Sequence, residues 1–239
     1  MKSSPHLHNS TPPPLHNPMR VIAVIPAYHE AKTIADVVKT VRGFVDETIV
    51  IDDGSMDETG MIARVAGATV ITHTLNRGLG AALGTGFEAA RALGADAVVT
   101  LDADGQHDPA EITKLLGALE NGSDFVIGSR LLTRGSMPAH RVIANRLGNL
   151  ITFLLFSAWV SDSQSGFRAL NRRALERITI RSNRMEVSSE LIAEAKRHGL
   201  HIAEVPVRAI YTPYSLSKGQ GFVVGLKTLL KLVLKRLTL

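Results

Sequence analysis

A buried strand that stops at a pair of acidic residues is the feature that most constrains this chain. The apolar run 97–101 ends at Asp102, and Asp102-Ala103-Asp104 is followed by the turn residue Gly105. Asp108-Pro109-Ala110-Glu111 then has the pattern of a helix start, with Asp as the N-cap and Pro at the first helical position. Because open α/β sheets bind ligands at the carboxyl edge of their strands, the acids predict a ligand site in this loop.

The acidic pair has two interpretations. Two carboxylates as close as Asp102 and Asp104 repel each other unless a cation lies between them, and oxygen ligands suit Mg²⁺ or Mn²⁺. Alternatively, both serve only as capping and turn residues, since Asp-Gly turns are common. A second acidic strand end upstream, Asp52-Asp53-Gly54-Ser55, favours the metal site.

Strands alternate with helical patterns over the first part of the chain, which predicts a largely parallel sheet with crossover helices. The strands are unbroken apolar runs, as expected for strands buried on both faces. A capping box at Ser55-Met56-Asp57-Glu58 is expected to begin one of the helices. Strands are predicted at 20–25, 47–51, 68–72, 97–101 and 124–128, and helices at 30–42, 78–93 and from 112.

The regular alternation of predicted strands and helices ends after Arg130. A long helical segment is predicted at 141–160, and its second half, 147–160, is almost wholly apolar. This half could be a buried core helix or a helix at a membrane surface; at 14 residues it is shorter than the ~20 needed to span a bilayer. A polar loop at 161–168, helices at 170–178 and 187–198 and a strand at 201–207 follow.

The two ends of the chain differ from the domain between them. Residues 1–18 are rich in Pro and His without apolar periodicity, which predicts a disordered tail. Residues 222–239 form a cationic amphipathic pattern, with Lys227, Lys231 and Lys235 four residues apart. Such a helix lies at a membrane surface, although a domain-packing or oligomer helix would look similar. The expected folded domain is therefore 19–221, attached peripherally to a membrane.

Overall composition narrows the possible partners. The formal net charge is +5, so anionic partners are plausible, but no feature calls for nucleic acid. The chain has no cysteine, which excludes disulfides and thiolate metal sites. Gly78, Gly80 and Gly84 do not have the spacing of a dinucleotide loop and are interpreted as close helix packing.

The ends of the predicted strands carry the strongest functional signal. In a parallel sheet they converge on one edge, which would bring together several acids, an aromatic residue and a cation. Acids hold ribose hydroxyls and base edges, while a metal with an arginine neutralises a diphosphate. This set of side chains suits a nucleotide-diphosphate ligand.

Four segments, PAYHE, IVIDDGSMDET, LDADGQHDP and IGSR, occur in an order that resembles the family-2 inverting glycosyltransferases. The resemblance covers roughly 20–221 and implies the GT-A fold, a Rossmann-like α/β/α sandwich with a mostly parallel central sheet. Three later segments, SGFR, EVP and SLSK, are similar to those of the dolichyl- or polyprenyl-phosphate mannosyltransferase branch.

The resemblance also implies roles for individual residues. Asp104 and Arg130 would be catalytic. Metal ligands would be Asp102, Asp104 and Gln106, with Mg²⁺ or Mn²⁺ as the ion. The acceptor phosphate would contact Arg141, Asn145 and Lys218. The donor would contact Pro26, Tyr28, Glu30, Ile51, Asp53, Asp102, Ala103, Asp104, Arg130 and Lys218.

Three positions depart from the family pattern. His29 stands where Asn is usual, and we expect its ring to point outward rather than to perturb the turn. Thr212 replaces a basic residue, and Asn145 replaces a serine near the acceptor phosphate. Because of these changes, the resemblance does not fix which acceptor or which exact donor is used, although a sugar nucleotide is still expected.

The expected activity is metal-dependent transfer of a hexose, with inversion, from a donor of the GDP-mannose or UDP-glucose type to a polyprenyl or dolichyl phosphate. It would occur at the cytoplasmic face of the membrane, with a membrane subunit or a second copy of the chain as a further partner. One alternative is a soluble or glycan acceptor in cell-envelope polysaccharide synthesis, with Asp104 or a nearby acid as the base. Another is a non-catalytic subunit that binds nucleotide sugars.

Overall fold

The computed structural model describes residues 19–133, 139–156 and 158–212 of the chain. The predicted tail at 1–18, Lys218 and the predicted amphipathic helix at 222–239 lie outside the described residues.

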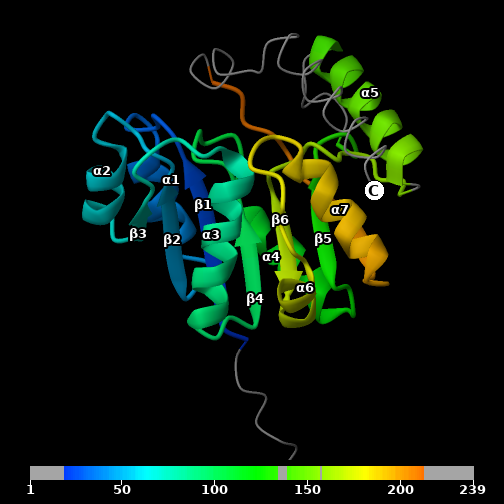
Figure 1. Ribbon diagram of the computed structural model, residues 1–239, viewed down its shortest axis with the longest axis horizontal. Helices are drawn as coiled ribbons and strands as arrows, with labels where there is room; N and C mark the ends of the chain where they lie inside the picture. Colours follow the sequence, from blue (N-terminus) through cyan, green and yellow to red (C-terminus); the bar gives the residue numbers. More distant parts are fainter. Residues whose placement is uncertain (1–18, 134–138, 157, 213–239) are drawn as a thin grey trace, which may run out of the picture.

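A seven-stranded sheet forms the centre of the molecule, in the order β3-β2-β1-β4-β6-β5-β7 (Figure 1). Every pairing is parallel except those of β6, which is antiparallel to both β4 and β5. The predicted mostly parallel sheet is therefore confirmed. The strands are β1 Val21–Ala27, β2 Glu47–Asp52, β3 Thr69–Thr72, β4 Ala97–Thr100, β5 Phe125–Ser129, β6 Arg168–Asn171 and β7 Ile202–Pro206.

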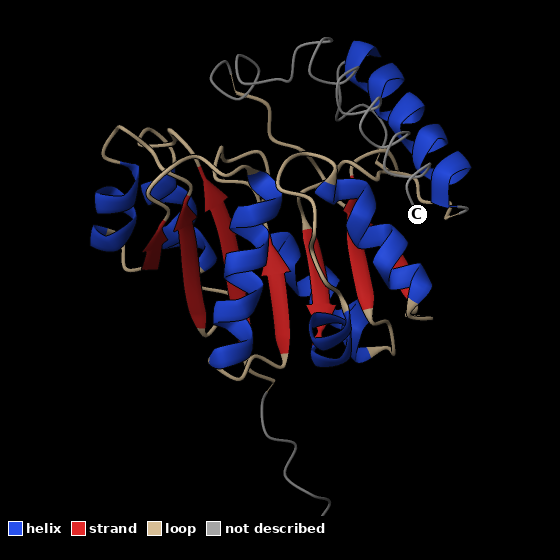
Figure 2. Cartoon of the chain, in the orientation of Figure 1, coloured by secondary structure: helices blue, strands red, loops and turns tan. Residues whose placement is uncertain are grey.

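Helices cover both faces of the sheet, which gives the predicted α/β/α sandwich (Figure 2). One apolar core joins the sheet to α3, α6 and α7, and the other joins it to α1, α2 and α4. Helix α5 lies apart from both layers, beyond the carboxyl ends of the strands (Figure 1). The helices are α1 Ile34–Val41, α2 Thr59–Val65, α3 Leu79–Ala92, α4 Ile112–Glu120, α5 Ala139–Phe156, α6 Arg172–Arg177 and α7 Val187–Arg197, with a 3-10 turn at Pro109–Glu111.

Strand β1 shows why the apolar runs are unbroken. Ile22 and Val24 face the α3 side of the sheet, Ala23 and Ile25 face the α1 side, and all four are fully buried. The central strands thus have no solvent face, as predicted. The edge strand β3 differs, because both its ends are exposed.

Strand β6 was not expected, and the helix predicted at 170–178 is wrong over its first part. Arg168–Asn171 pairs with β4 and β5, and α6 begins only at Arg172. The Asn171 side chain accepts a hydrogen bond from the Ala174 amide at 2.8 Å and so caps the helix directly from the strand. Because no turn residue separates strand from helix, the sequence carries no signal for where the strand ends and the helix begins.

Two helix starts had distinct signals, and only one is confirmed. Asp108 accepts a hydrogen bond from the Ala110 amide at 3.0 Å and opens the 3-10 turn before α4, as predicted. The capping box at 55–58 does not form: α2 begins at Thr59, whose amide donates to Asp57 at 3.1 Å. The Ser55 hydroxyl instead accepts the His29 amide at 3.0 Å.

Helix α3 crosses the sheet closely because of one glycine. A Cβ atom on Gly86 would lie 2.3 Å from Cγ1 of Val24 in β1, whereas one on Gly84 would meet nothing within 4 Å. The predicted close packing is confirmed at Gly78 and Gly80, where an added Cβ would clash with the backbone oxygens of Asn183 and Ser182, but not at Gly84. Gly86 adds the close contact with β1.

The paired substitutions Gly86→Ala and Gly84→Ala test this packing. Gly86→Ala should lower the free energy of unfolding by about 1–3 kcal/mol, because it overpacks the contact with β1. Gly84→Ala should raise it by up to about 1 kcal/mol, since alanine favours the helix and the site is open. Urea denaturation of both variants measures the difference, and equal effects would contradict the proposed contact.

Candidate active site

The acidic strand ends meet at one edge of the sheet, as predicted. Strand β1 lies between β2 and β4, so the loops that follow these three strands are neighbours. Asp52 is the last residue of β2 and pairs with Ala27, the last residue of β1. Asp102 and Asp104 follow β4 in the adjacent loop. The nucleoside and metal residues predicted from the sequence are therefore brought together.

The residues after β1 form the first wall of the site. Strand β1 continues through Pro26, which is tolerated because pairing with β4 stops at Val24. Tyr28 is 46% exposed, whereas Glu30 is buried and its amide donates to the Thr59 hydroxyl at 2.8 Å. Among the predicted nucleoside contacts, Tyr28 is therefore the most exposed to solvent.

His29 does not point outward, and that expectation is wrong. Its Nε2 accepts a hydrogen bond from the Met56 amide at 3.3 Å, and its ring centroid lies 4.2 Å from that of Tyr28. Its φ of 56° lies in the left-handed region, where asparagine and histidine are enriched among non-glycine residues. His29 can therefore occupy a position at which the family usually has Asn.

Asp53 is buried and holds the loop before α3. Its Oδ1 accepts the Arg77 amide at 2.9 Å and lies 2.7 Å from His73 Nδ1, while Oδ2 accepts the Gly78 amide at 2.7 Å. Ile51 is fully buried in the core, so it would contact a ligand only through its backbone. The nucleoside roles of both residues stay predictions.

Asp102 and Asp104 experience opposite electrostatic environments. Desolvation and the negative charge of Asp102 raise the pKa of Asp104. Desolvation would also raise the pKa of Asp102, but the hydrogen bond from His107 and the charges of His107, Arg130 and Arg168 hold it below its usual value. The repulsion between the two acids is therefore felt mainly by Asp104.

This arrangement fits a divalent cation. The Gln106 amide donates to Asp104 Oδ1 at 3.0 Å and its side chain also bonds to that carboxylate, while the charge of Asp102 acts on the same Asp104. Within 19–133, 139–156 and 158–212, no group of three or more His, Asp or Glu could hold a metal. A site with so few protein ligands suits Mg²⁺ or Mn²⁺, because Mg²⁺ is commonly bound by one or two carboxylates together with substrate phosphates.

Arg130 is held by an acid that the sequence analysis missed. Its Nε and one terminal nitrogen donate to Asp162 at 2.8 and 2.9 Å, and its amide donates to the same carboxylate at 3.0 Å. The Asp162 side chain is fully buried, so the pair is shielded from solvent. Burial alone would lower the pKa of Arg130, but Asp162 raises it. Arg130 is thus fixed in position and remains charged.

Helix α5 contacts Asp162, the partner of Arg130, and the neighbouring Ser163. The Asn145 side chain donates to Asp162 at 3.3 Å, and Asn149 Oδ1 accepts the Ser163 amide at 2.8 Å. Asn145, predicted to lie near the acceptor phosphate, therefore sits beside the partner of Arg130. For Arg141 the structure describes only the backbone, within α5, so its predicted role is not tested.

Arg168 is the second residue of the site that sequence reasoning missed. It lies in the quoted SGFR segment, but the resemblance gave it no role. Its side chain is among the largest that are fully buried. One terminal nitrogen donates to the Ser163 carbonyl at 2.9 Å and to the Ser188 carbonyl at 3.4 Å. The arginine joins the loop before β6 to the first turn of α7.

Comparison with protein families identifies the chain. The model of glycosyl transferase family 2 matches residues 22–179, which include both acidic loops and Arg130. The chain belongs to glycosyl transferase family 2. It is therefore a glycosyltransferase with the predicted type of fold, which does not favour the alternative of a non-catalytic binding subunit.

Several curated relatives match almost the whole chain. An uncharacterised protein of Methanocaldococcus jannaschii is 42% identical, with 92% of this chain and 94% of that protein covered. The UDP-N-acetylglucosamine–dolichyl-phosphate N-acetylglucosaminyltransferase of Methanococcus voltae is 36% identical, covering 91% of this chain and 96% of that enzyme. The polyprenol monophosphomannose synthase of Mycolicibacterium smegmatis is 31% identical, covering 84% and 82%.

A solved structure confirms the fold. Glucosyl-3-phosphoglycerate synthase from Mycobacterium tuberculosis, crystallised with Mn²⁺, UDP-glucose and phosphoglyceric acid, matches with a TM-score of 0.72. The match covers 92% of this chain and 80% of that one at 24% identity. At this identity the likeness concerns the fold alone.

The substitution Asp104→Asn tests the charge arrangement. Without metal it should raise the free energy of unfolding at neutral pH by up to about 1 kcal/mol, because it removes an acid that repels Asp102. It should also abolish the rise in melting temperature that Mn²⁺ causes in the unmodified protein. Thermal unfolding with and without Mn²⁺ measures both effects, and an undiminished Mn²⁺ shift in the variant would contradict the metal role of Asp104.

Proposed function

We propose that this glycosyltransferase moves a hexose from a nucleotide-diphosphate sugar to a polyprenyl or dolichyl phosphate, with Mg²⁺ or Mn²⁺ bound at the acidic loop. The observation that carries the proposal is the position of α5, whose exposed apolar face adjoins the edge that holds Arg130. Relatives named for transfer to dolichyl phosphate and for synthesis of polyprenol monophosphomannose support it.

The donor half of the site follows from the acidic strand ends. Asp102, Asp104 and Gln106 would hold the cation, which when bound supplies charge neutralisation for the departing diphosphate. Tyr28 and the other residues after β1 and β2 would hold the nucleoside. Arg130, fixed by Asp162, would bind a diphosphate oxygen through its guanidinium group. The site would thus stabilise the charge of the leaving group without moving Arg130.

The acceptor decides whether a base is needed. A lipid phosphate arrives as an anion, and its oxygen attacks the anomeric carbon from the face opposite the diphosphate, which inverts the configuration. No proton has to be removed, so positioning and electrostatics suffice. A glycan hydroxyl would instead need a base, and the raised pKa of Asp104 makes it the candidate for that alternative.

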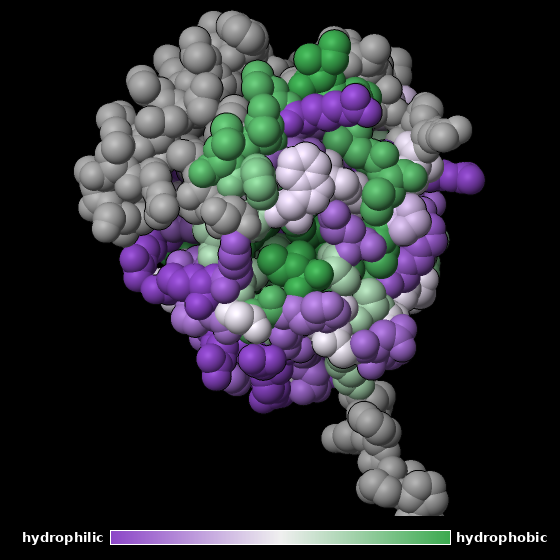
Figure 3. Space-filling view, turned by 90° about the vertical axis from the view of Figure 1, so that its right-hand side faces the viewer, coloured by the Kyte–Doolittle hydropathy of each residue, from purple (hydrophilic) through white to green (hydrophobic). Residues whose placement is uncertain are grey.

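Helix α5 supplies a surface for the lipid. Leu147, Leu150 and Leu154 lie on one face and are 54%, 44% and 69% exposed, and Trp159 just beyond the helix is 69% exposed. Figure 3 shows hydrophobic side chains gathered on the upper part of the side where α5 lies. Of the alternatives predicted for 147–160, the interfacial helix therefore fits better than a fully buried one. No helix in the described part of the chain is long and apolar enough to cross a membrane.

Transfer of labelled sugar tests the proposed reaction. The full chain is incubated with Mn²⁺, polyprenyl phosphate and GDP-mannose, UDP-glucose or UDP-N-acetylglucosamine. Label should enter an organic-extractable, mild-acid-labile product only when lipid phosphate is present. Label that enters water-soluble glycan regardless of lipid phosphate would reject this acceptor and support the glycan alternative.

Vesicle flotation tests the role of α5. The double variant Leu147→Ser, Leu154→Ser should bind anionic vesicles roughly tenfold more weakly, because burial of a leucine side chain contributes about 1.5–3 kcal/mol when complete. A matched control is Met61→Ser, Val65→Ser on α2, which removes exposed apolar side chains of similar size elsewhere. Equal vesicle binding by the two variants would rule out the α5 face as a membrane contact.

A further inference from the structure

His73 is a buried histidine outside the set of residues predicted to bind the donor. It directly follows the edge strand β3, and its backbone amide donates to the Asp52 carbonyl at 2.9 Å. Its side chain is only 7% exposed. Nδ1 lies 2.7 Å from Asp53 Oδ1, and Nε2 lies 2.9 Å from the hydroxyl of Thr85 in α3. One ring therefore connects the ends of β2 and β3 with the helix that follows them.

The two partners of the ring decide which nitrogen donates. A carboxylate only accepts hydrogen bonds, so Nδ1 must be the donor to Asp53. In the neutral ring Nε2 is then the acceptor, and the Thr85 hydroxyl can donate to it. Both ring nitrogens of His73 are thus satisfied inside the protein, which fixes the plane of the ring and the direction of the N–H group that meets Asp53.

The Asp53 carboxylate is held unequally at its two oxygens. Oδ1 accepts hydrogen bonds from His73 and from the Arg77 amide, whereas Oδ2 accepts one from the Gly78 amide. Because a carboxylate oxygen can accept two hydrogen bonds, Oδ2 keeps capacity for a further donor. Oδ2 is therefore the oxygen through which Asp53 can bind a ligand.

Of these three donors, His73 has the firmest support. The two amides close a loop in which residues 74–77 are all exposed, so they can follow a movement of that loop. His73 is instead anchored on β2 by its own amide and on α3 by Thr85. The backbone of Asp53 is tied to the end of β1, because its amide donates to the Ala27 carbonyl at 2.8 Å. His73 is thus the group that fixes how the carboxylate is turned on this rigid backbone.

We propose that His73 is a positioning residue for the donor, which holds Asp53 so that Oδ2 meets a hydrogen-bond donor of the nucleoside. This inference rests on the proposed function, which places the nucleoside at the residues after β1 and β2. A carboxylate that is already oriented loses less freedom when the ligand binds, so His73 increases affinity without touching the ligand. Its effect is confined to the nucleoside, since Asp102 and Asp104 hold the cation and the diphosphate.

Two substitutions separate the two hydrogen bonds of the ring. The side-chain nitrogen of asparagine occupies about the place of Nδ1, and that of glutamine about the place of Nε2. His73→Asn should therefore keep the bond to Asp53, whereas His73→Gln should keep only the bond to Thr85. Isothermal titration calorimetry of the full chain with Mn²⁺ measures the Kd for UDP and for GDP, and the tighter ligand is used. His73→Gln should raise this Kd roughly tenfold, and His73→Asn should raise it far less.

Inorganic pyrophosphate distinguishes positioning of the nucleoside from general damage to the site. It binds with Mn²⁺ at the diphosphate position but has no nucleoside, so its Kd should be unchanged in both variants. In transfer assays the KM for the sugar nucleotide should rise in His73→Gln while kcat stays the same, as for loss of binding that does not change during the reaction.

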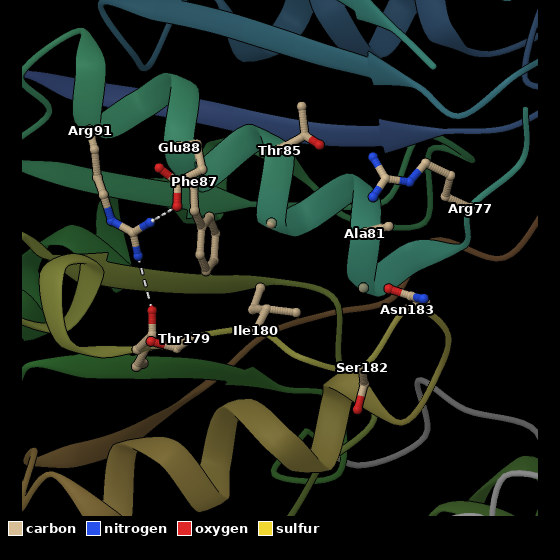
Figure 4. Close-up of a pocket in the computed structure, with 13 residues that line it drawn as sticks. Arg77, Ala81, Thr85, Phe87, Glu88, Arg91, Thr179, Ile180, Ser182 and Asn183 are labelled. Carbon is tan, nitrogen blue, oxygen red and sulfur yellow. Dashed lines mark hydrogen bonds and ion pairs between the residues drawn. The ribbon is translucent and has the colours of Figure 1, made fainter. Parts of the chain in front are cut away.

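Thr85 provides an independent pair of variants if a substitution of His73 impairs folding. Thr85 is half-buried in α3 and lines a cavity of about 300 Å³ between this helix and residues 178–183, which leaves room beside it (Figure 4). Thr85→Val removes the hydroxyl that holds Nε2 and should raise the nucleoside diphosphate Kd in the same direction as His73→Gln. Thr85→Ser keeps the hydroxyl and should restore the original Kd.

The matched control is His198→Gln at the end of α7. His198 also lies near an acid, with Nε2 3.7 Å from Glu194, but it is not part of the carboxyl edge. The same chemical change should leave the Kd for the nucleoside diphosphate and for pyrophosphate unaltered.

Two results would overturn the inference while the proposed function stands. One is an equal Kd for the nucleoside diphosphate in His73→Asn and His73→Gln, or in Thr85→Val and Thr85→Ser. The other is a loss of pyrophosphate binding as large as the loss of nucleoside diphosphate binding, which would show a structural effect only. Absence of transfer to lipid phosphate by the unmodified protein, with nucleoside diphosphate binding intact, would contradict the proposed function and leave the role of His73 standing.

Discussion

The antiparallel strand β6 between β4 and β5 is the constraint on which the site depends. A parallel sheet brings only the loops that follow its strands to the carboxyl edge. Because β6 runs the other way, the loop that precedes it reaches that same edge. Asp162, which holds Arg130, and Gln164 lie in this loop, and Arg168 begins the strand. One reversed strand therefore adds the basic half of the site to the acidic half that the parallel strands provide.

Charges on the two halves are balanced in different ways. Arg130 has an immediate partner in Asp162, and Asn145 and Asn149 connect α5 to the same loop. A lipid bound along α5 would therefore be positioned by the structure that orients Arg130. Burial lowers the pKa of Arg168 to about 10, so it still carries its charge at neutral pH. The acidic loop, in contrast, contains a repulsion that a bound cation would relieve.

The sequence predicted the acidic half of this arrangement well and the basic half poorly. Unbroken apolar runs that end at acids imply parallel strands, and parallel strands imply that Asp53, Asp102 and Asp104 share an edge. No comparable pattern marks β6, because Arg168–Asn171 is short, starts with a charged residue and continues directly into α6. The roles of Asp162 and Arg168 depend on that strand, so local periodicity could not reveal them. The orientation of His29 could not be predicted locally, because its ring accepts a hydrogen bond from the amide of Met56, which is distant in the sequence.

The account rests on a metal–diphosphate site at the carboxyl edge between β1, β4 and β6. The most direct measurement is an anomalous difference map from crystals grown with Mn²⁺ and a nucleoside diphosphate. The account predicts one strong peak at about 2–2.5 Å from oxygens of Asp102, Asp104 and the diphosphate. A diphosphate bound at this edge with its Mn²⁺ outside the reach of both acids would contradict it, as would a diphosphate bound elsewhere on the chain.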